Sequence, residues 1–434
     1  MTLFDERTVA RDLFQDLFPL CRSLTGAGVR QTLRRLGEIM PLTIQEYPSG
    51  TKVYDWTIPP EWTIRDAYVA DASGRRLIDF RANNLHLVGY STPIQAEMGF
   101  AELAPHLHTH PDWAEAIPYR TAYYQREWGF CLSQRHRAEF DPSGHYQVVI
   151  DADLAPGSLT LADAFLPGEE EGEYLISTYC CHPSLANDNL SGLILVALLY
   201  NRLAERPHRR FGYRFVICPE TIGAITYLAH HQEAMQRVRG GFVVTCVAGP
   251  GPLSVKHSYQ GNHELDRATQ VWCRDQGLER LDYPFSIHGS DERQYSPPPW
   301  RIPMISICKD KYYEYPQYHT SLDNLDFISV DSLLTTLDAH VGVIDVLERN
   351  RFPLGKGACE PCLSAHNIET APGGTMHPGQ IEPHQADVEA WLWTSFYADG
   401  QHDLLAIAEQ TGLSFAQVAK AATQLRNHQL LDWP

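Results

Sequence analysis

The sequence lacks any run of the roughly 18 apolar residues that a membrane-spanning helix needs. It is also short of positive charge: 35 Lys and Arg residues stand against 53 Asp and Glu residues, which gives a formal net charge of −18. This balance argues against a nucleic acid or an anionic membrane surface as the main partner. It also makes a cationic group on a substrate easier to accept. No internal repeat is found.

A secretory signal is not expected either. The first residues carry acids from Asp5 onward and are amphipathic, which predicts a surface helix instead. The ten cysteines are spread over a long chain, so we expect reduced thiols in a cytoplasmic protein, with Cys180 and Cys181 buried. The CxxC motif at Cys359 and Cys362 has no second pair with zinc-ribbon spacing, so no structural zinc is expected there.

What is present is the composition of a globular protein, because 44% of the 434 residues are hydrophobic and 20% are charged. Changes of pattern along the chain divide it into four parts. The predicted parts are an α/β domain at 1–42 and 166–352, a small β-rich module at 43–165, a linker at 353–386 and a helical tail at 387–434.

In the α/β domain, strand patterns alternate with helical ones, which predicts a mixed, mostly parallel sheet flanked by helices. The predicted strands are EYLISTYC, YRFVIC, GGFVVTCVA and RIPMISIC, and the predicted helices cover 6–40, 189–204, 222–233 and 330–348. Sheets of this kind place their sites where strand ends meet loops. In the tail, helix–turn–helix spacing around Gly412 indicates a winged-helix-like domain.

Polar residues follow the ends of three predicted strands. His182 and Asp188 follow the first, Glu220 follows the second, and His319 lies after the last, in a loop rich in aromatic residues. Imidazole and carboxylate groups delivered by strand ends are typical of a zinc site. Each residue also has a plainer explanation, namely a capping Asp with an incidental His, a Glu that compensates a helix dipole, or a structural His beside aromatics.

Taken together, these segments resemble a known family. CHPSLANDNLSG, PETIGAITYL, GSDERQY and YHTSLDNLDF are similar to motifs of the zinc aminopeptidases with the glutamate-carboxypeptidase and leucyl-aminopeptidase fold. The chain more closely resembles bacterial polysaccharide-biosynthesis proteins with an aminopeptidase-like domain. That resemblance covers nearly the whole chain, including the winged-helix-like tail.

The resemblance implies a role for each matched residue. His182, Asp188 and His319 match metal ligands, Asp188 being the carboxylate that bridges two zinc ions in the family, and Glu220 matches the general base. The chain departs from the pattern at Thr221 and close to Thr245, where the family has carboxylates. The resemblance therefore implies a single zinc ion, with water completing its coordination.

The GSDERQY segment is expected to line the substrate pocket. Asp291 and Glu292 could bind an α-ammonium group, and Arg293 could bind a carboxylate. Tyr295 could stabilise an oxyanion. The equally weighted alternative is a salt-bridged surface loop.

The expected function is zinc-dependent hydrolysis of a peptide or amide bond, with release of an N-terminal amino acid from a small substrate. The alternative is a catalytically inactive aminopeptidase-like protein that binds a small molecule or a partner in a biosynthetic pathway. A DNA-binding role is disfavoured, because the tail has only Lys420 and Arg426 as basic residues among many acids. No nucleic-acid or membrane partner is expected, and homo-oligomer formation is left open.

Overall fold

The computed structural model describes residues 5–366 and 383–433. Part of the predicted linker, residues 367–382, lies outside the described residues. The chain separates into two compact units, one of residues 1–261 and 281–340, the other of residues 262–280 and 341–434. Within the described residues, every helix is too short or too polar to span a bilayer.

The N-terminal segment forms two helices, α1 (Glu6–Leu17) and α2 (Ala27–Leu36), and the single helix predicted for 6–40 is wrong. Asp5 caps α1 by accepting a hydrogen bond from the backbone N–H of Arg7. Gly26 precedes α2 with a φ of 98° and lies so close to the backbone of Trp62 that a Cβ would stand 2.7 Å from the Trp62 carbonyl oxygen. This left-handed conformation separates the two helices.

The first unit is built on an eight-stranded sheet. Its strands, in spatial order, are β1 (Thr43–Pro48), β10 (Ser158–Leu166), β12 (Gly212–Cys218), β11 (Glu173–Tyr179), β13 (Val238–Val243), β16 (Met304–Lys309), β14 (Leu253–Lys256) and β15 (Arg280–Tyr283). The central strands β12, β11, β13 and β16 pair in parallel, while β1, β10 and β14 pair antiparallel toward the edges. The predicted mixed, mostly parallel sheet is therefore found in the centre.

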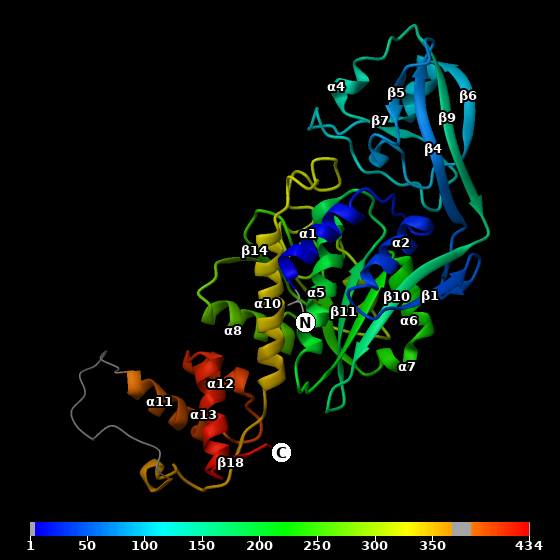
Figure 1. Cartoon of the computed structure of the whole chain (residues 1–434). Helices are drawn as coiled ribbons and strands as arrows, with labels where there is room; N and C mark the ends of the chain where they lie inside the picture. The colour runs from blue at the N-terminus through cyan, green and yellow to red at the C-terminus, as the bar shows by residue number, and fades with distance from the viewer. Residues whose placement is uncertain (1–4, 367–382, 434) are drawn as a thin grey trace. The chain divides into compact units, whose positions relative to one another are not determined.

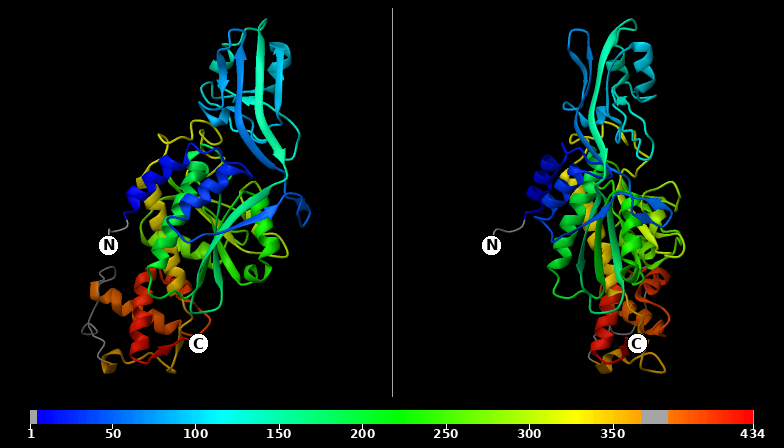
Figure 2. Two further views of the ribbon diagram at one scale, coloured as in Figure 1. Left: turned by 45° about the vertical axis from the view of Figure 1, so that its right-hand side comes forward. Right: turned by 90° about the vertical axis from the view of Figure 1, so that its right-hand side faces the viewer.

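Helices cover both faces of this sheet (Figures 1 and 2). The crossover from β11 to β12 carries α5 (Gly192–Ala204), and the one from β12 to β13 carries α6 (Ile222–His230) and α7 (Gln232–Met235). The two crossovers run in opposite directions across the sheet, so the right-handed crossover rule puts α5 and α6 on opposite faces. Because β11, β12 and β13 are parallel, their carboxyl ends lie at one edge of the sheet, and the change of direction makes a switch point there, which is where α/β sheets bind ligands.

Between β1 and β10 the chain forms a smaller antiparallel sheet, drawn in blue, cyan and blue-green in Figure 1. Its strands are β5 (Arg76–Asp79), β4 (Glu61–Asp71), β9 (His145–Ala155) and β6 (Ile94–Gly99). The same stretch of the chain also contains short elements: β2 (Lys52–Val53), β3 (Trp56–Thr57), α3 (Phe100–Leu103), β7 (Leu107–His108), β8 (Phe130–Cys131) and α4 (Gln134–Arg137). The predicted module 43–165 also included β1 and most of β10, which pair within the large sheet.

The second unit contains α8 (Glu264–Asp275), α11 (Pro383–Phe396), α12 (Leu404–Thr411) and α13 (Phe415–Asn427). Gly412 ends α12 in the left-handed conformation with a φ of 73°, which confirms the predicted turn. The strands β17 (Leu354–Gly355) and β18 (Leu431–Asp432) pair antiparallel. The helix α10 (Val330–Arg349) matches the helix predicted for 330–348.

Candidate metal centre

His182 lies three residues beyond the end of β11. Its backbone carbonyl accepts a hydrogen bond of 2.8 Å from Nε of the buried Arg22, which holds the loop in place. The ring is buried, and burial lowers the pKa of His182 to about 4. The imidazole is therefore neutral at physiological pH, which is the form that binds a metal.

Asp188 lies in the turn that leads into α5. Its backbone is not helical, with φ −111° and ψ 88°, and α5 itself begins at Gly192, later than the predicted start at 189. Burial raises the pKa of Asp188, but the interactions of its carboxylate with His182 and His319 outweigh burial and lower the pKa overall. The carboxylate is therefore ionised although it is fully buried.

His319 completes a three-residue cluster. Its Nε2 atom lies 2.9 Å from Oδ2 of Asp188, and Nε2 of His182 lies 3.9 Å from the same oxygen. Both Oδ2 of Asp188 and Nε2 of His319 are buried, and apart from their contact with each other they make no hydrogen bond to any residue that the structure describes. Two imidazoles and a carboxylate that converge with unpartnered atoms fit the ligand set of a zinc ion.

Glu220 follows β12 and borders this cluster. Its Oε2 atom lies 3.9 Å from Nε2 of His182, and its Oε1 atom accepts a hydrogen bond of 3.0 Å from the hydroxyl of Ser290. The side chain is 26% exposed, so a substrate can reach it. Burial, followed by the charge of Asp188, raises the pKa of Glu220 to about 7, which suits a group that exchanges protons near neutral pH.

Cys181 could also contribute a ligand atom beside His182 and Glu220. Burial raises the pKa of Cys181 well above its ordinary value, and its sulfur accepts a hydrogen bond of 3.3 Å from the backbone N–H of Glu220. A neutral thiol is a poor zinc ligand. The cluster of His182, Asp188 and His319 is therefore the better candidate.

Sequence reasoning gave Asp323 no role, yet it holds the turn that presents Asp188. Its two carboxylate oxygens accept backbone N–H bonds from Asn187 at 2.6 Å and from Asp188 at 2.9 Å. The hydroxyl of Tyr315 donates to it as well, at 3.1 Å. The available signal was its place four residues after His319 in the HTSLD motif.

Tyr179 and Thr245 were not expected to act together. The hydroxyl of Tyr179 donates to Oδ1 of Asp188 and lies 2.6 Å from the hydroxyl of Thr245. These two hydroxyl groups occupy the side of Asp188 that faces Thr245. The resemblance to the zinc aminopeptidases implies, close to Thr245, a carboxylate that would bind a second metal ion. One oxygen of Asp188 is thus satisfied by the protein, and only the other is open.

The GSDERQY segment behaves differently from what was expected, and three of its four assignments are corrected. Glu292 is buried and bonded to the buried Lys256 and to the hydroxyl of Tyr312 at 2.9 Å, so it does not face a substrate ammonium. Asp291 is also buried and accepts the backbone N–H of Thr221 at 2.7 Å. It therefore helps to position the Glu220–Thr221 junction.

Tyr295 lies in the core of the unit, with its hydroxyl 3.0 Å from that of Ser177, and it cannot reach an oxyanion. Arg293 alone keeps the expected exposure. Its Nη2 donates to the hydroxyl of Thr221 at 3.2 Å, which places the guanidinium beside Glu220. The charge that this segment presents at the site is therefore positive.

Aromatic residues around the cluster were also missed. The Tyr318 ring stacks on His319 with a centroid distance of 3.9 Å. Tyr119 belongs to the long insertion between β1 and β10, and its ring lies 5.1 Å from that of His182 and 5.0 Å from that of His319. Its backbone N–H donates to the His319 carbonyl at 2.8 Å. The insertion thus forms part of the wall of the site.

Solved structures show that the large sheet and its helices have an aminopeptidase-like fold. A zinc aminopeptidase from Bacillus subtilis is 13% identical, with a TM-score of 0.57 over 78% of this chain and 93% of that one. A peptidase M28 precursor from Shewanella amazonensis is 12% identical, with a TM-score of 0.52 over 79% and 96%. At these identities the likeness shows the fold alone.

The family itself is shown by closer matches. A family model described as "Domain of unknown function (DUF4910)" matches residues 11–350, and one described as "winged helix-turn-helix" matches residues 357–433. The chain therefore belongs to the DUF4910 family and carries a C-terminal winged helix-turn-helix domain.

A relative from Clostridium acetobutylicum is 40% identical over 97% of this chain and 95% of its own length. It is provisionally named a polysaccharide biosynthesis protein with an aminopeptidase-like domain. A crystal structure from the same organism, of a protein provisionally named a peptidase, is 38% identical. Its TM-score is 0.91 over 99% of this chain and 97% of that one.

Proposed function

We propose that this protein is a zinc-dependent hydrolase that cleaves a peptide or amide bond in a small substrate. The observation that carries the proposal is the convergence of the buried His182 and Asp188 with the partly exposed His319, beside the partly exposed Glu220. The aminopeptidase-like fold supports it, because the site lies at the strand ends where such sheets bind ligands. The provisional name of the Clostridium acetobutylicum relative also mentions an aminopeptidase-like domain.

His182, Asp188 and His319 would hold the zinc ion. When bound, zinc lowers the pKa of a water ligand to about 7 and polarises a carbonyl oxygen. Glu220 would take a proton from the attacking water and deliver it to the leaving nitrogen. The hydroxyl of Ser290 orients the Glu220 carboxylate for both transfers by its hydrogen bond to Oε1.

We further propose one zinc ion per chain. The bridging position in a two-metal site requires both oxygens of Asp188 to face metal ions, but its Oδ1 accepts a hydrogen bond from the hydroxyl of Tyr179. Thr245 supports that hydroxyl from the other side. Metal analysis of the purified full chain checks this number, and two tightly bound ions per chain would contradict it.

The proposal of hydrolysis is tested with Glu220→Gln. The amide keeps the shape of the side chain but cannot act as a base, so we expect bound zinc to remain and turnover to fall by roughly 10²–10⁴-fold. The measurement pairs zinc content with hydrolysis of a panel of dipeptides and amides. A Glu220→Gln protein that has lost its zinc would show that Glu220 is a ligand and that its proposed role is wrong.

Release of an N-terminal amino acid is the narrower form of this function. It needs a group that binds the substrate ammonium, and Asp291 and Glu292 are both engaged inside the protein. The exposed Arg293 would instead favour a substrate with a carboxylate near the scissile bond. We therefore propose amide hydrolysis without a requirement for a free N-terminus.

A catalytically inactive protein is the second candidate, and the observation that favours it is the pair Thr221 and Thr245 where the zinc aminopeptidases have carboxylates. Such a protein would bind a small molecule or a partner at the same site. The metal analysis separates the two candidates. An inactive protein that has lost its metal site would contain no zinc even after purification in the presence of zinc.

The winged helix-turn-helix domain is proposed to have a packing role rather than to bind nucleic acid. Lys420 is paired with Asp387 at 2.9 Å, and Arg426 lies 3.5 Å from Asp432. Each of these cations already has a carboxylate neighbour, which would compete with a phosphate for it. Binding of duplex DNA by the full chain that weakens steeply with salt would contradict this proposal.

A further inference from the structure

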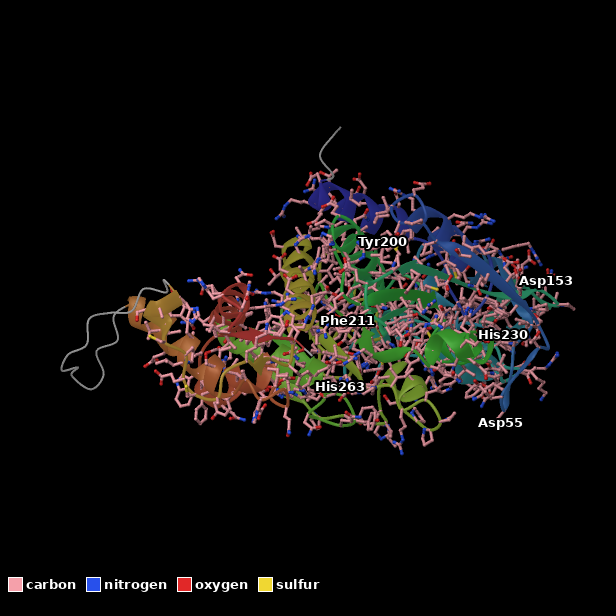
Figure 3. All side chains as sticks on the ribbon, turned by 90° about the horizontal axis from the view of Figure 1, so that it is seen from below. Asp55, Asp153, Tyr200, Phe211, His230 and His263 are labelled. Atoms are coloured by element: carbon pink, nitrogen blue, oxygen red, sulfur yellow. The ribbon has the colours of Figure 1, made fainter. Side chains whose placement is uncertain are left out.

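A second cavity lies in the same unit as the metal cluster, beside the β2–β3 hairpin. Its volume is about 540 Å³, within the range of small-molecule sites. It is formed by the hairpin, the Pro59–Pro60 segment and residues 123–126. Asp55, at the tip of the hairpin, lies at the outer edge of the unit in Figure 3.

Aromatic rings form the walls of this cavity. At the rim, Trp56 and Tyr124 have ring centroids 5.7 Å apart and an interplanar angle of 67°, and their exposed fractions are 39% and 52%. Deeper in the cavity, Tyr90 and Tyr123 meet edge to face at 5.6 Å. The Tyr90 hydroxyl lies 2.6 Å from that of Thr25, so the inner wall is fixed while the rim rings are open.

Polar side chains complete the rim. Asp55 offers only acceptors, Arg126 offers only donors, and Gln125 offers both. The side chains of all three make no hydrogen bond or ion pair to any residue in the described part of the chain. The cavity therefore combines flat apolar surfaces with free hydrogen-bonding groups of both kinds.

The cavity is connected to the metal cluster through two tyrosines. The hydroxyl of Tyr123, a lining residue, lies 2.8 Å from that of Tyr119. The Tyr119 ring in turn contacts the rings of His182 and His319. A ligand in the cavity is thus separated from the metal cluster by two side chains, Tyr123 and Tyr119.

We propose that this cavity binds a pyranose ring of the substrate, so that the hydrolysed amide belongs to a glycosylated molecule. The substrate class rests on the proposed hydrolase function, whereas the sugar site itself does not. A pyranose ring has C–H faces that pack on aromatic rings and hydroxyl groups that donate and accept at its edge. It can satisfy Asp55, Gln125 and Arg126 together.

An aromatic or aliphatic peptide side chain fits the cavity less well. It would pack on Trp56 and Tyr124, but it would cover the three polar side chains of the rim without offering them partners. Covering unpartnered polar groups costs free energy that a saccharide recovers through its hydroxyl groups. The chemistry of the rim therefore selects a neutral sugar over a hydrophobic residue.

The test measures binding without turnover, in the full-length Glu220→Gln protein. The probes are methyl β-D-glucopyranoside, methyl N-acetyl-β-D-glucosaminide and, as the competing ligand, N-acetyl-L-phenylalaninamide. Saturation-transfer NMR reports ring contact, and calorimetry reports affinity. We expect at least one pyranoside to bind, with Trp56→Ala and Tyr124→Ala each weakening it by about fivefold or more.

The matched control is Trp113→Ala. Trp113 is 40% exposed, close to the 39% of Trp56, and it does not line the cavity. Its affinity for the pyranoside should equal that of the parent protein. Thermal unfolding of each variant checks that the fold is intact. Three results would overturn the sugar site. They are the absence of pyranoside binding, pyranoside binding that Trp56→Ala and Tyr124→Ala leave unchanged, and binding of the phenylalanine amide alone.

The outcome is separable from that of the proposed hydrolase. Pyranoside binding without hydrolysis of any amide would refute the enzyme and leave the sugar site standing. If both hold, Trp56→Ala should lower kcat/KM for glycosylated amides in the wild-type background and leave that for unglycosylated amides unchanged. Equal losses for both substrates would place the pocket outside substrate recognition.

Discussion

The metal cluster and the GSDERQY segment are two regions of the same unit that are rich in acidic or imidazole side chains. They differ in whether the polar atoms of these side chains are paired with other residues of the protein. Asp188 and His319 keep buried atoms that contact each other but make no hydrogen bond to any further described residue, whereas Glu292 is engaged by Lys256 and Tyr312. Buried polar groups cost free energy unless they have partners. A convergent set of atoms without protein partners therefore indicates a ligand, and a paired set indicates structure.

The paired region also contains two atoms without a hydrogen bond to the described part of the chain. Oε2 of Glu292 and Oδ2 of Asp291 are also buried without a hydrogen bond to a described residue. Neither carboxyl group belongs to a cluster of three or more possible metal ligands among the described residues, and the other oxygen of each is bonded. Convergence, rather than a single unpartnered atom, separates the two regions.

The largest effect is expected from removal of a metal ligand. His182→Ala and His319→Ala should each lower zinc affinity by more than roughly 100-fold, because substitution of a residue that only supports a ligand already costs up to that much. Hydrolysis should disappear with the metal. The measurement is zinc content after dialysis against a competing chelator. The matched control is Cys181→Ser, which should retain zinc because the Cys181 thiol stays protonated. Loss of zinc in that control would make Cys181 a ligand.

The next effect concerns stability in the paired region. Glu292→Gln leaves the charge of Lys256 buried without a counter-ion, because the two side chains are only 2% and 1% exposed. We expect the free energy of unfolding to fall by about 3–5 kcal/mol, measured by chemical denaturation. A Lys256→Met and Glu292→Met double variant removes both charges and should be less destabilised. Unchanged stability together with a raised KM would instead return Glu292 to the substrate pocket.

A smaller effect is expected behind the metal ligands. Tyr179→Phe removes the hydroxyl that donates to Oδ1 of Asp188 and should lower zinc affinity by roughly 10–100-fold. Thr245→Val, one hydrogen bond further away, should have a weaker effect in the same titration. A Tyr179→Phe protein that binds a second zinc ion would show that the hydroxyl alone prevents the two-metal site.

The smallest effect is expected at the exposed Arg293. Arg293→Ala should raise KM for substrates with a free carboxylate by up to about fivefold, because an exposed charge contact is weak. Substrates with an amidated carboxyl group should be unaffected, and N-acetylation of the substrate should not abolish hydrolysis by the wild type. Strict dependence on a free amino group would restore the narrower aminopeptidase function.

Much of the fold could be predicted because strands and helices leave periodic patterns. The strand ends that carry His182 and Glu220 were found in this way, and the turn at Gly412 was found from its glycine. Elements broken by local backbone changes were predicted too long. The N-terminal helix is interrupted at Gly26, and α5 begins only after the non-helical backbone at Asp188.

The candidate site could be predicted only in part. The residues proposed as ligands lie together as expected, but Asp291, Glu292 and Tyr295 do not take the roles expected from their types. A carboxylate looks the same in a sequence whether it faces a substrate or a buried lysine. The partner of Glu292, Lys256, is 36 residues away, and nothing in the local pattern connects them.

The sequence by itself determined the order of strands and helices and the residue types at each strand end. The elements follow from the periodicity of apolar residues, and the chemical type of a side chain does not depend on where it lies in the fold. Only the tertiary structure decided which atoms are left without partners, because that depends on contacts between distant segments. The same is true of Tyr119, which an insertion more than sixty residues upstream brings against His182.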